Sequence, residues 1–352
     1  MPIWKHIINR FGLCLLLITP GVNAMSSKPD LNTLELSFRQ NCAGRYQLEL
    51  PADMRQVKGS FGLPEIGFNV YAPDSNNHDD GVFRGDNRLA RWLSYIEAKR
   101  TERKSIKAHY VLQDTKGDSP LKTVVYYADI RELMVDKNAM HTYKSFFFKD
   151  FPQQNMGLTM SPGLGRGKFE RSDSQYKQKF SQQLKVMQGK AEQVHYVPWP
   201  HTRLGLCLDD ELVFEQAQPS SIERYLVKFY NGKNTRMNIR VRSHSKNSDD
   251  YIAKGIKEAS GLLSIFASTN MKVAGREGKL FISDGYLPGS SDFRWFSTDT
   301  KSDSIRFAHI EIDGDVDIND YPELKGLNGT EVVYGFLKGV TIRPNGMMGV
   351  TK

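Results

Sequence analysis

Residues 223–242 read Glu-Arg-Tyr-Leu-Val-Lys-Phe-Tyr-Asn-Gly-Lys-Asn-Thr-Arg-Met-Asn-Ile-Arg-Val-Arg and carry a strong signal of β-structure. Apolar and polar residues alternate over 223–230 and again over 236–242, which is the period of a strand with one buried face. Asn231-Gly232 between the two runs favours a β-hairpin, and the two residues that follow this pair lengthen its loop. The stretch therefore predicts two antiparallel strands.

Similar patterns predict further strands and three helices on both sides of this hairpin. The predicted strands lie at 46–51, 66–72, 107–113, 121–128, 279–283, 293–297, 305–313 and 340–343, and two short ones within 204–214 flank residues 209–211. Apolar stripes with helical spacing predict helices that begin at Asp86, Ser172 and Ser248, the second of them stopped by Gly189. The sequence thus predicts an α+β fold.

The length of the chain favours two domains. After removal of an export signal 328 residues remain (352 − 24), against a usual domain size of roughly 150 residues. The stretch Val197-Pro198-Trp199-Pro200 is typical of a linker, because each proline restricts itself and its predecessor to extended conformations. We expect an N-terminal α+β domain at 25–197 and a C-terminal one at 198–352, each a mainly antiparallel sheet packed with one or two helices.

The first 24 residues have the pattern of a removable export signal. Lys5 and Arg10 flank the apolar run 11–18, and small residues at 22–24 form a cleavage pattern ending at Ala24. A lipid anchor on Cys14 is an alternative, although cleavage there would cut the apolar run in half. No segment approaches the roughly 20 apolar residues of a spanning helix. We expect a soluble protein of the periplasm without stable membrane insertion.

The formal charge of +8 falls to +6 (8 − 2) when the two cations of the signal are removed. A mildly basic chain can bind nucleic acid, anionic lipid headgroups or acidic proteins, or can simply use its charge to stay soluble. An exported protein rarely meets nucleic acid, so we expect no nucleic-acid partner.

Two cysteines remain after cleavage of the signal, Cys42 and Cys207. In an oxidising compartment an even pair is a disulfide candidate. A bridge would close a loop of 165 residues (207 − 42). It would stabilise the folded protein by about 5 kcal/mol, because it lowers the conformational entropy of the unfolded chain. The alternative is two small buried residues that never meet, because free cysteine packs well as a hydrophobe.

The motifs of common exported hydrolases are missing from the sequence. It contains neither the Gly-x-Ser-x-Gly elbow of serine hydrolases nor the His-Glu-x-x-His of zinc proteases. The fragment nearest to the elbow, residues 289–292, lacks the second glycine, and the glycine-rich stretch 161–168 lacks the spacing of a P-loop. We therefore predict no catalytic residues and no cofactor.

An acidic run near the C-terminus is the best local candidate for ion chemistry. The first three carboxylates of an EF-hand are matched by Asp313, Asp315 and Asp317. The match then fails, because Ile318 stands where glycine is needed and Leu324 where a bidentate glutamate is needed. An acidic surface loop and a face that docks a protein remain as alternatives to calcium binding.

Two pairs of segments resemble a known protein family. Residues 41–51 (Asn-Cys-Ala-Gly-Arg-Tyr-Gln-Leu-Glu-Leu-Pro) and 204–210 (Leu-Gly-Leu-Cys-Leu-Asp-Asp) are similar to the paired domain openings of immunity proteins that neutralise type VI secreted phospholipase effectors. Residues 273–278 and Phe293-Arg294-Trp295 resemble the C-terminal domain of that family, in which a glycine-containing turn precedes an aromatic-Trp strand.

This resemblance implies an exported protein with two α+β domains that grips a cognate lipase and keeps lipid from its active site. It implies no catalysis and no cofactor. Exposed charged loops can steer such an encounter, and our candidates for partner contact are Arg166, Lys168, Asp313, Asp315, Asp317 and Asp320. Two other classes stay open, an exported hydrolase with a non-standard active site and a periplasmic module that binds a ligand or the envelope.

Overall fold

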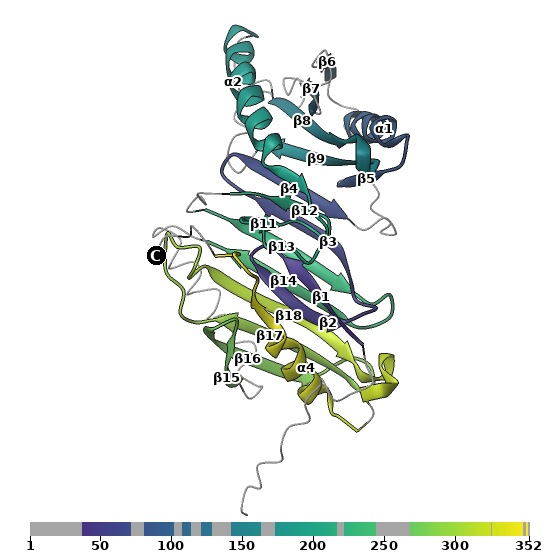
Figure 1. Cartoon of the computed structure of the whole chain (residues 1–352), viewed down its shortest axis with the longest axis vertical. Coiled ribbons are helices and arrows are strands. Elements are labelled where there is room, and N and C mark those ends of the chain that lie inside the picture. Colours follow the sequence, from purple (N-terminus) through teal and green to yellow (C-terminus); the bar gives the residue numbers. More distant parts are fainter. Residues whose placement is uncertain are drawn as a thin grey trace, which may run out of the picture.

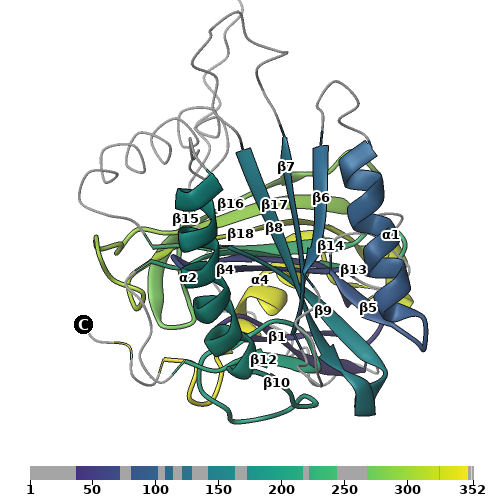
Figure 2. The same ribbon diagram turned by 90° about the horizontal axis from the view of Figure 1, so that it is seen from above.

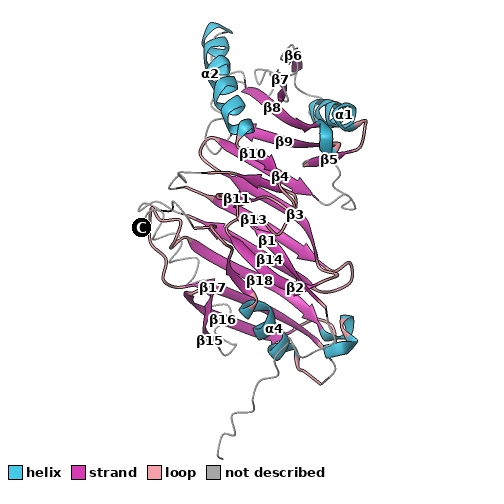
Figure 3. Cartoon of the chain, in the orientation of Figure 1, coloured by secondary structure: helices cyan, strands magenta, loops and turns pink. Residues whose placement is uncertain are grey.

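A computed structural model describes residues 37–71, 81–101, 108–113, 121–128, 142–162, 173–216, 222–243, 268–324, 326–347 and 350. This part of the chain is mostly antiparallel sheet with three α-helices, which confirms the predicted α+β class (Figures 1 and 3). In the described residues no helix is both long and apolar enough to cross a membrane.

One antiparallel sheet of thirteen strands runs the length of the molecule (Figure 1). Its strands follow the order β15 (Ser268–Val273), β16 (Arg276–Asp284), β17 (Ser290–Ser297), β18 (His309–Asp317), β14 (Arg236–Arg242), β13 (Arg224–Tyr230), β3 (Arg55–Gly62), β4 (Ile66–Tyr71), β9 (Met156–Pro162), β8 (Thr142–Phe151), β7 (Leu121–Ala128) and β6 (Ala108–Gln113), and β5 (Val82–Arg84) pairs with β9 beside this path.

The predicted hairpin lies in the middle of this sheet. Strands β13 and β14 pair in register from Arg224 opposite Arg242 to Tyr230 opposite Arg236, so the hairpin prediction is confirmed. The N-terminal strand β3 pairs with β13, and the C-terminal strand β18 pairs with β14. The hairpin therefore joins strands from the two halves of the chain.

Two small sheets and one helix cover one face of the main sheet (Figure 2). The small sheets are β1 (Phe38–Ala43), β2 (Tyr46–Pro51) and β19 (Val340–Ile342), and β10 (Val194–Tyr196), β12 (Leu212–Phe214) and β11 (Leu206–Cys207), and the helix is α4 (Gly329–Lys338). Alternation along β2 buries Tyr46, Leu48 and Leu50 against the sheet. The main core forms here, between the sheet and these covering elements.

A second, smaller core lies on the opposite face, at the end of the sheet that carries β8 and β9. Helix α1 (Arg88–Thr101) places Trp92 and Ile96 on one side and packs them against Phe148. The ring centroids of Trp92 and Phe148 are 5.0 Å apart. The neighbouring Phe147 belongs to the main core, because successive side chains of a strand point to opposite faces.

The cysteines form the predicted disulfide, which joins β1 to β11. The Cα atoms of Cys42 and Cys207 are 6.1 Å apart. Beside the bridge, Gly44 and Cys207 exchange two backbone hydrogen bonds of 2.9 Å each. Gly44 has a φ of +61°, and a Cβ atom there would lie 2.5 Å from the ring of Tyr225, so this turn requires glycine.

A buried ion pair lies next to the disulfide. Arg45 and Glu223 are 1% and 0% exposed, and the Nε of Arg45 donates to Glu223 Oε2 at 2.8 Å. A second donor of the guanidinium reaches Gly346 O at 2.6 Å, and a third reaches Gln216 Oε1 at 3.2 Å. Burial opposes the charge, but the hydrogen bond and charge of Glu223 outweigh it and raise the pKa of Arg45.

Arg343, which is also buried, anchors the C-terminal segment to the same place. Its side chain donates to the carbonyl oxygens of Gly44 at 3.1 Å and of Arg203 at 2.7 Å. Burial, together with the charge of Arg45, lowers the pKa of Arg343 to about 10. Segments from the start, middle and end of the chain thus meet at one polar cluster.

Several predicted boundaries were wrong: β16 and β17 begin three residues before the predicted 279 and 293, and β18 ends at Asp317 and not at 313. Helix α2 (Asp173–Glu192) continues past Gly189, because its last turn still buries Ala191 in the core. Strand β18 starts at His309 and not at residue 305, because Ile305 lies in a turn that Ser304 closes by accepting a hydrogen bond from Phe307 N at 3.1 Å. The helix predicted from Ser248 lies outside the described residues, as does the export signal.

The division into two domains at 197/198 stays a prediction. The main sheet continues from one predicted domain into the other through the pairing of β3 with β13. On the two sides of the expected boundary, β10 and β12 also pair with each other, with Tyr196 opposite Leu212.

Glu223→Gln is expected to lower the free energy of unfolding by about 3 kcal/mol, because it leaves the charge of Arg45 buried without its counter-ion. Urea unfolding of the disulfide-bonded protein measures this loss. Glu277→Gln is the matched control, since the Glu277–Lys272 pair is exposed. Equal unfolding midpoints for both variants would show that the buried pair contributes no more to stability than the exposed pair does.

Candidate protein-binding surface

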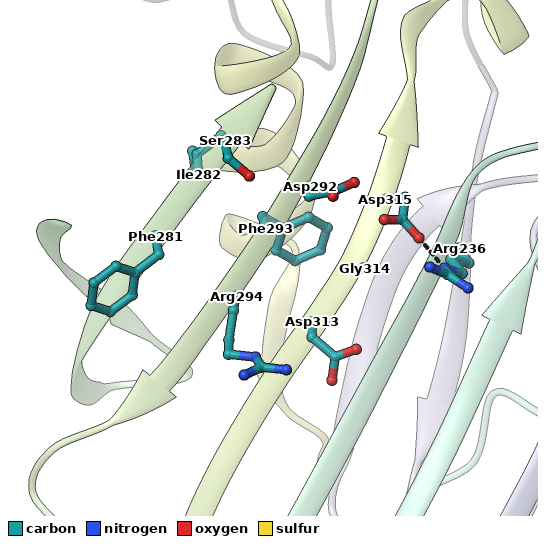
Figure 4. Close-up of a pocket in the computed structure, with 10 residues that line it drawn as sticks. All are labelled: Arg236, Phe281, Ile282, Ser283, Asp292, Phe293, Arg294, Asp313, Gly314 and Asp315. Carbon is teal, nitrogen blue, oxygen red and sulfur yellow. Dashed lines mark hydrogen bonds and ion pairs between the residues drawn. The ribbon is translucent and has the colours of Figure 1, made fainter. Parts of the chain in front are cut away.

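A concavity of about 310 Å³ lies on the sheet face opposite the main core, over strands β14, β18, β17 and β16 (Figure 4). Its wall combines charged side chains with aromatic ones. The lining residues are Arg236, Phe281, Ile282, Ser283, Asp292, Phe293, Arg294, Asp313, Gly314 and Asp315.

The polar character of this face follows from the alternation of the strands. On β18 the residues Ile310, Ile312 and Val316 enter the core, so the residues between them point to the other face. On β14, Met237 and Ile239 enter the core in the same way. The charged side chains of both strands therefore lie side by side on one face of the sheet, and we call this row of side chains the charged ladder.

The rungs of the ladder are ion pairs and hydrogen bonds across neighbouring strands. Arg240 Nη1 lies 2.5 Å from Glu311 Oε2, and Arg294 Nε lies 3.3 Å from Glu311 Oε1. Asn238 Nδ2 donates to Asp313 Oδ2 at 2.7 Å, and Arg236 forms an ion pair with Asp315. Each pair is fixed by strand register and not by a flexible loop.

Two carboxylates adjoin at one end of the concavity. Asp292 on β17 lies opposite Asp315 on β18, and Figure 4 shows the two side chains next to each other. A hydrogen bond to Asp315, together with burial and the charge of Asp315, raises the pKa of Asp292 to about 6. One proton can therefore be shared by this pair in mildly acidic solution.

Asp317 and Asp320 are buried and hold the loop of the β13–β14 hairpin. Asp320 Oδ2 accepts from Thr235 N at 2.9 Å, Thr235 Oγ1 at 2.9 Å and Asn234 N at 3.1 Å. Asp317 Oδ2 accepts from Asn234 Nδ2 at 3.1 Å. Burial alone would raise the pKa of Asp320, but these hydrogen bonds outweigh it and hold the pKa below its usual value.

The acidic run is therefore not a surface loop, as one interpretation of the sequence had it. Asp313, Asp315 and Asp317 lie in strand β18, and Asp320 ends a short 3-10 turn (Ile318–Asp320). The error arose because an alternating Asp pattern fits an ion-binding loop and the polar face of a strand equally well. The described residues hold no group of three or more His, Cys, Asp or Glu side chains placed for a metal ion.

The two basic candidates, Arg166 and Lys168, lie outside the described residues. A role in partner contact stays a prediction for them and for the four aspartates. The structure adds neighbours that the sequence reasoning missed, namely Arg236, Asp292 and Arg294. Their signal was the alternation of β14 and β17, but the strand order that makes them neighbours could not be read from the chain.

The family-like segments lie at structural junctions. Residues 41–51 form the β1–β2 hairpin around Gly44, and residues 204–210 include β11, which carries Cys207. Residues 273–278 include the β15–β16 turn, and Trp295 lies in β17 and donates from Nε1 to Met271 O at 2.9 Å.

Asp320→Ala is expected to destabilise the protein by at least about 2 kcal/mol, because it leaves buried donors of the hairpin loop without an acceptor. Thermal or urea unfolding measures the loss. Asp284→Ala, at an exposed position of β16, is the control with an unchanged midpoint. A fully stable Asp320→Ala protein would contradict the structural role assigned to this carboxylate.

Asp292→Asn is expected to raise the thermal unfolding midpoint at pH 7.5 more than at pH 4.5. The raised pKa of Asp292 means that the folded state binds its proton more tightly, so this contribution to stability is present below pH 3.8 and lost as the pH rises through about 6. The amide avoids the repulsion between two ionised carboxylates at pH 7.5. An equal shift at both pH values would refute the shared proton.

No protein-family model matches the sequence, and the search of curated proteins gave no match. Solved structures do match the fold. The apo immunity protein TplEi of the type VI secretion system of Pseudomonas aeruginosa is 15% identical, with a TM-score of 0.50 over 87% of this chain and 97% of that one. The same protein complexed with an "L" peptide is 11% identical, with a TM-score of 0.50 over 87% and 98%.

A chain in the crystal structure of the Tle4–Tli4 complex is 14% identical, with a TM-score of 0.51 over 87% of this chain and 98% of that one. Sequence identities this low show a shared fold but do not show that individual residues have the same roles. The likeness covers 87% of this chain and nearly all of each matched chain. The resemblance expected from the short segments is thus confirmed at the level of structure: the protein has the fold of type VI secretion immunity proteins.

Proposed function

We propose that this chain is a periplasmic immunity protein that binds a cognate type VI secreted phospholipase and blocks the access of lipid to its active site. The observation that carries the proposal is the fold shared with type VI immunity proteins over 87% of the chain. Inhibition by binding needs no nucleophile and no cofactor, in keeping with the motifs that the sequence lacks.

The charged face of the main sheet suits this task. Stable inhibition requires a pre-organised surface, because ordering loops and side chains during association reduces affinity. The ladder of Arg236, Arg240, Glu311, Asp313 and Asp315 is already fixed by strand register. Charges arranged in this way would steer the encounter and exclude wrong partners more than they would add affinity.

Location is the second part of the proposal. The export pattern of residues 1–24 would send the chain to the periplasm, where an oxidising environment favours the Cys42–Cys207 bridge. The two predicted α+β domains would then act as one body through the pairing of β3 with β13. Protection would take place where an incoming lipase meets membrane lipid.

Co-expression of the full chain with a periplasm-directed copy of the phospholipase encoded beside it is expected to restore growth. A version that lacks residues 1–24 is expected to fail, since the two proteins would be in different compartments. Viable cell counts measure the protection, and co-purification measures the complex. Cell death together with no complex would refute the proposed function for this pair.

A further inference from the structure

The turn between β16 and β17 presents unusually exposed apolar side chains. Tyr286 is 99% exposed, more than any other large apolar residue that the structure describes, and the adjacent Leu287 is 40% exposed. Two adjacent exposed apolar side chains leave apolar area in water that a partner could cover, and a tyrosine contributes a large apolar ring with a polar hydroxyl group.

The backbone of this turn is held firmly in place. Gly285 N donates to Ser290 O and Ser290 N donates to Leu287 O, both at 2.9 Å. The hydroxyl of Ser290 also donates to Leu287 O at 2.7 Å and accepts from Leu287 N at 3.0 Å. The turn therefore presents Tyr286 at a defined position and would lose little conformational entropy on binding.

A second set of contacts fastens the turn to the end of β18. Asn319 Nδ2 donates to Pro288 O at 2.8 Å, and Ile318 N donates to Gly289 O at 3.2 Å. Asp317 Oδ1 in turn accepts from the backbone and side-chain nitrogens of Asn319 at 2.9 and 2.8 Å. The buried Asp317 thus helps to hold in place the apolar tip, by which we mean Tyr286 and Leu287.

The charges around the tip indicate the kind of partner. Between Ile282 and Phe293 the sequence contains Asp284 and Asp292 and no cation, and Arg294, which follows, forms an ion pair with Glu311. Both aspartates are exposed, so an anionic membrane surface would repel the tip. A protein with an apolar pocket and a basic rim would complement it. Asp292 also lines the concavity of Figure 4, so the strand that leaves the turn borders the charged face.

We propose that the β16–β17 turn is the anchor of the interface with the lipase, and that Tyr286 and Leu287 insert into an apolar pocket of that protein. This inference rests on the proposed function and deepens it. A lipid-cleaving enzyme must carry an apolar cleft for acyl chains, so the partner offers the matching chemistry. The charged ladder then forms the rim around a desolvated aromatic centre.

The test measures the affinity of the full disulfide-bonded chain for a catalytically inactive form of the phospholipase encoded beside it. Tyr286→Ala is expected to raise the dissociation constant at least about 30-fold, and Tyr286→Phe to change it less than about threefold, because the ring is kept. Ile342→Ala, which removes an exposed apolar residue from β19, is the matched control and should bind as the unchanged chain does.

The outcomes separate the two proposals. No binding by the unchanged chain overturns the proposed function and with it this partner. Tight binding by both the unchanged chain and Tyr286→Ala overturns the anchor alone. Equal unfolding midpoints show that Tyr286→Ala is folded. Sedimentation of the unchanged chain with phosphatidylglycerol–phosphatidylethanolamine vesicles would assign the tip to a membrane. A dimer of the unchanged chain that Tyr286→Ala dissociates would assign it to a second copy. Either result would also overturn the anchor.

Discussion

The buried pair of Arg45 and Glu223 is the constraint on which the architecture depends. Removing two charges from water is costly, and here each of the three nitrogens of the Arg45 guanidinium has an acceptor that offsets this cost. Those acceptors are Glu223 just before β13, Gln216 just after β12 and Gly346 near the C-terminus, and the Cys42–Cys207 bridge lies beside them. The pair and the bridge therefore connect the first strands, the central hairpin and the C-terminal segment in the folded protein.

This junction gives the protein a rigid sheet with two very different faces. One face is closed by the small sheets and α4 and holds the main core. The other carries paired charges over β14, β18 and β17, with a concavity at one end and the Tyr286 turn beyond it. Under the proposed function, this surface would recognise its partner by shape and charge pattern.

Local patterns in the sequence were enough to find most strands, but they located functional residues less well. The hairpin at 223–242 was predictable because both alternation and Asn-Gly point to it. The role of Asp317 and Asp320 was not, because an acidic run looks the same whether it binds an ion, faces solvent or caps a neighbouring loop. Only the position of Thr235 and Asn234 beside them shows that they support the hairpin.

By itself the sequence determined the α+β class, the cysteine pair as a disulfide candidate and the likeness to immunity proteins, since these rest on periodicity, residue type and short segments. The tertiary structure alone decided that one sheet runs through both halves of the chain, that Arg236, Asp292 and Arg294 meet Asp313 and Asp315, and that Tyr286 stands exposed. The physical reason is that strand order and burial depend on contacts between residues far apart in the chain, which local periodicity does not encode.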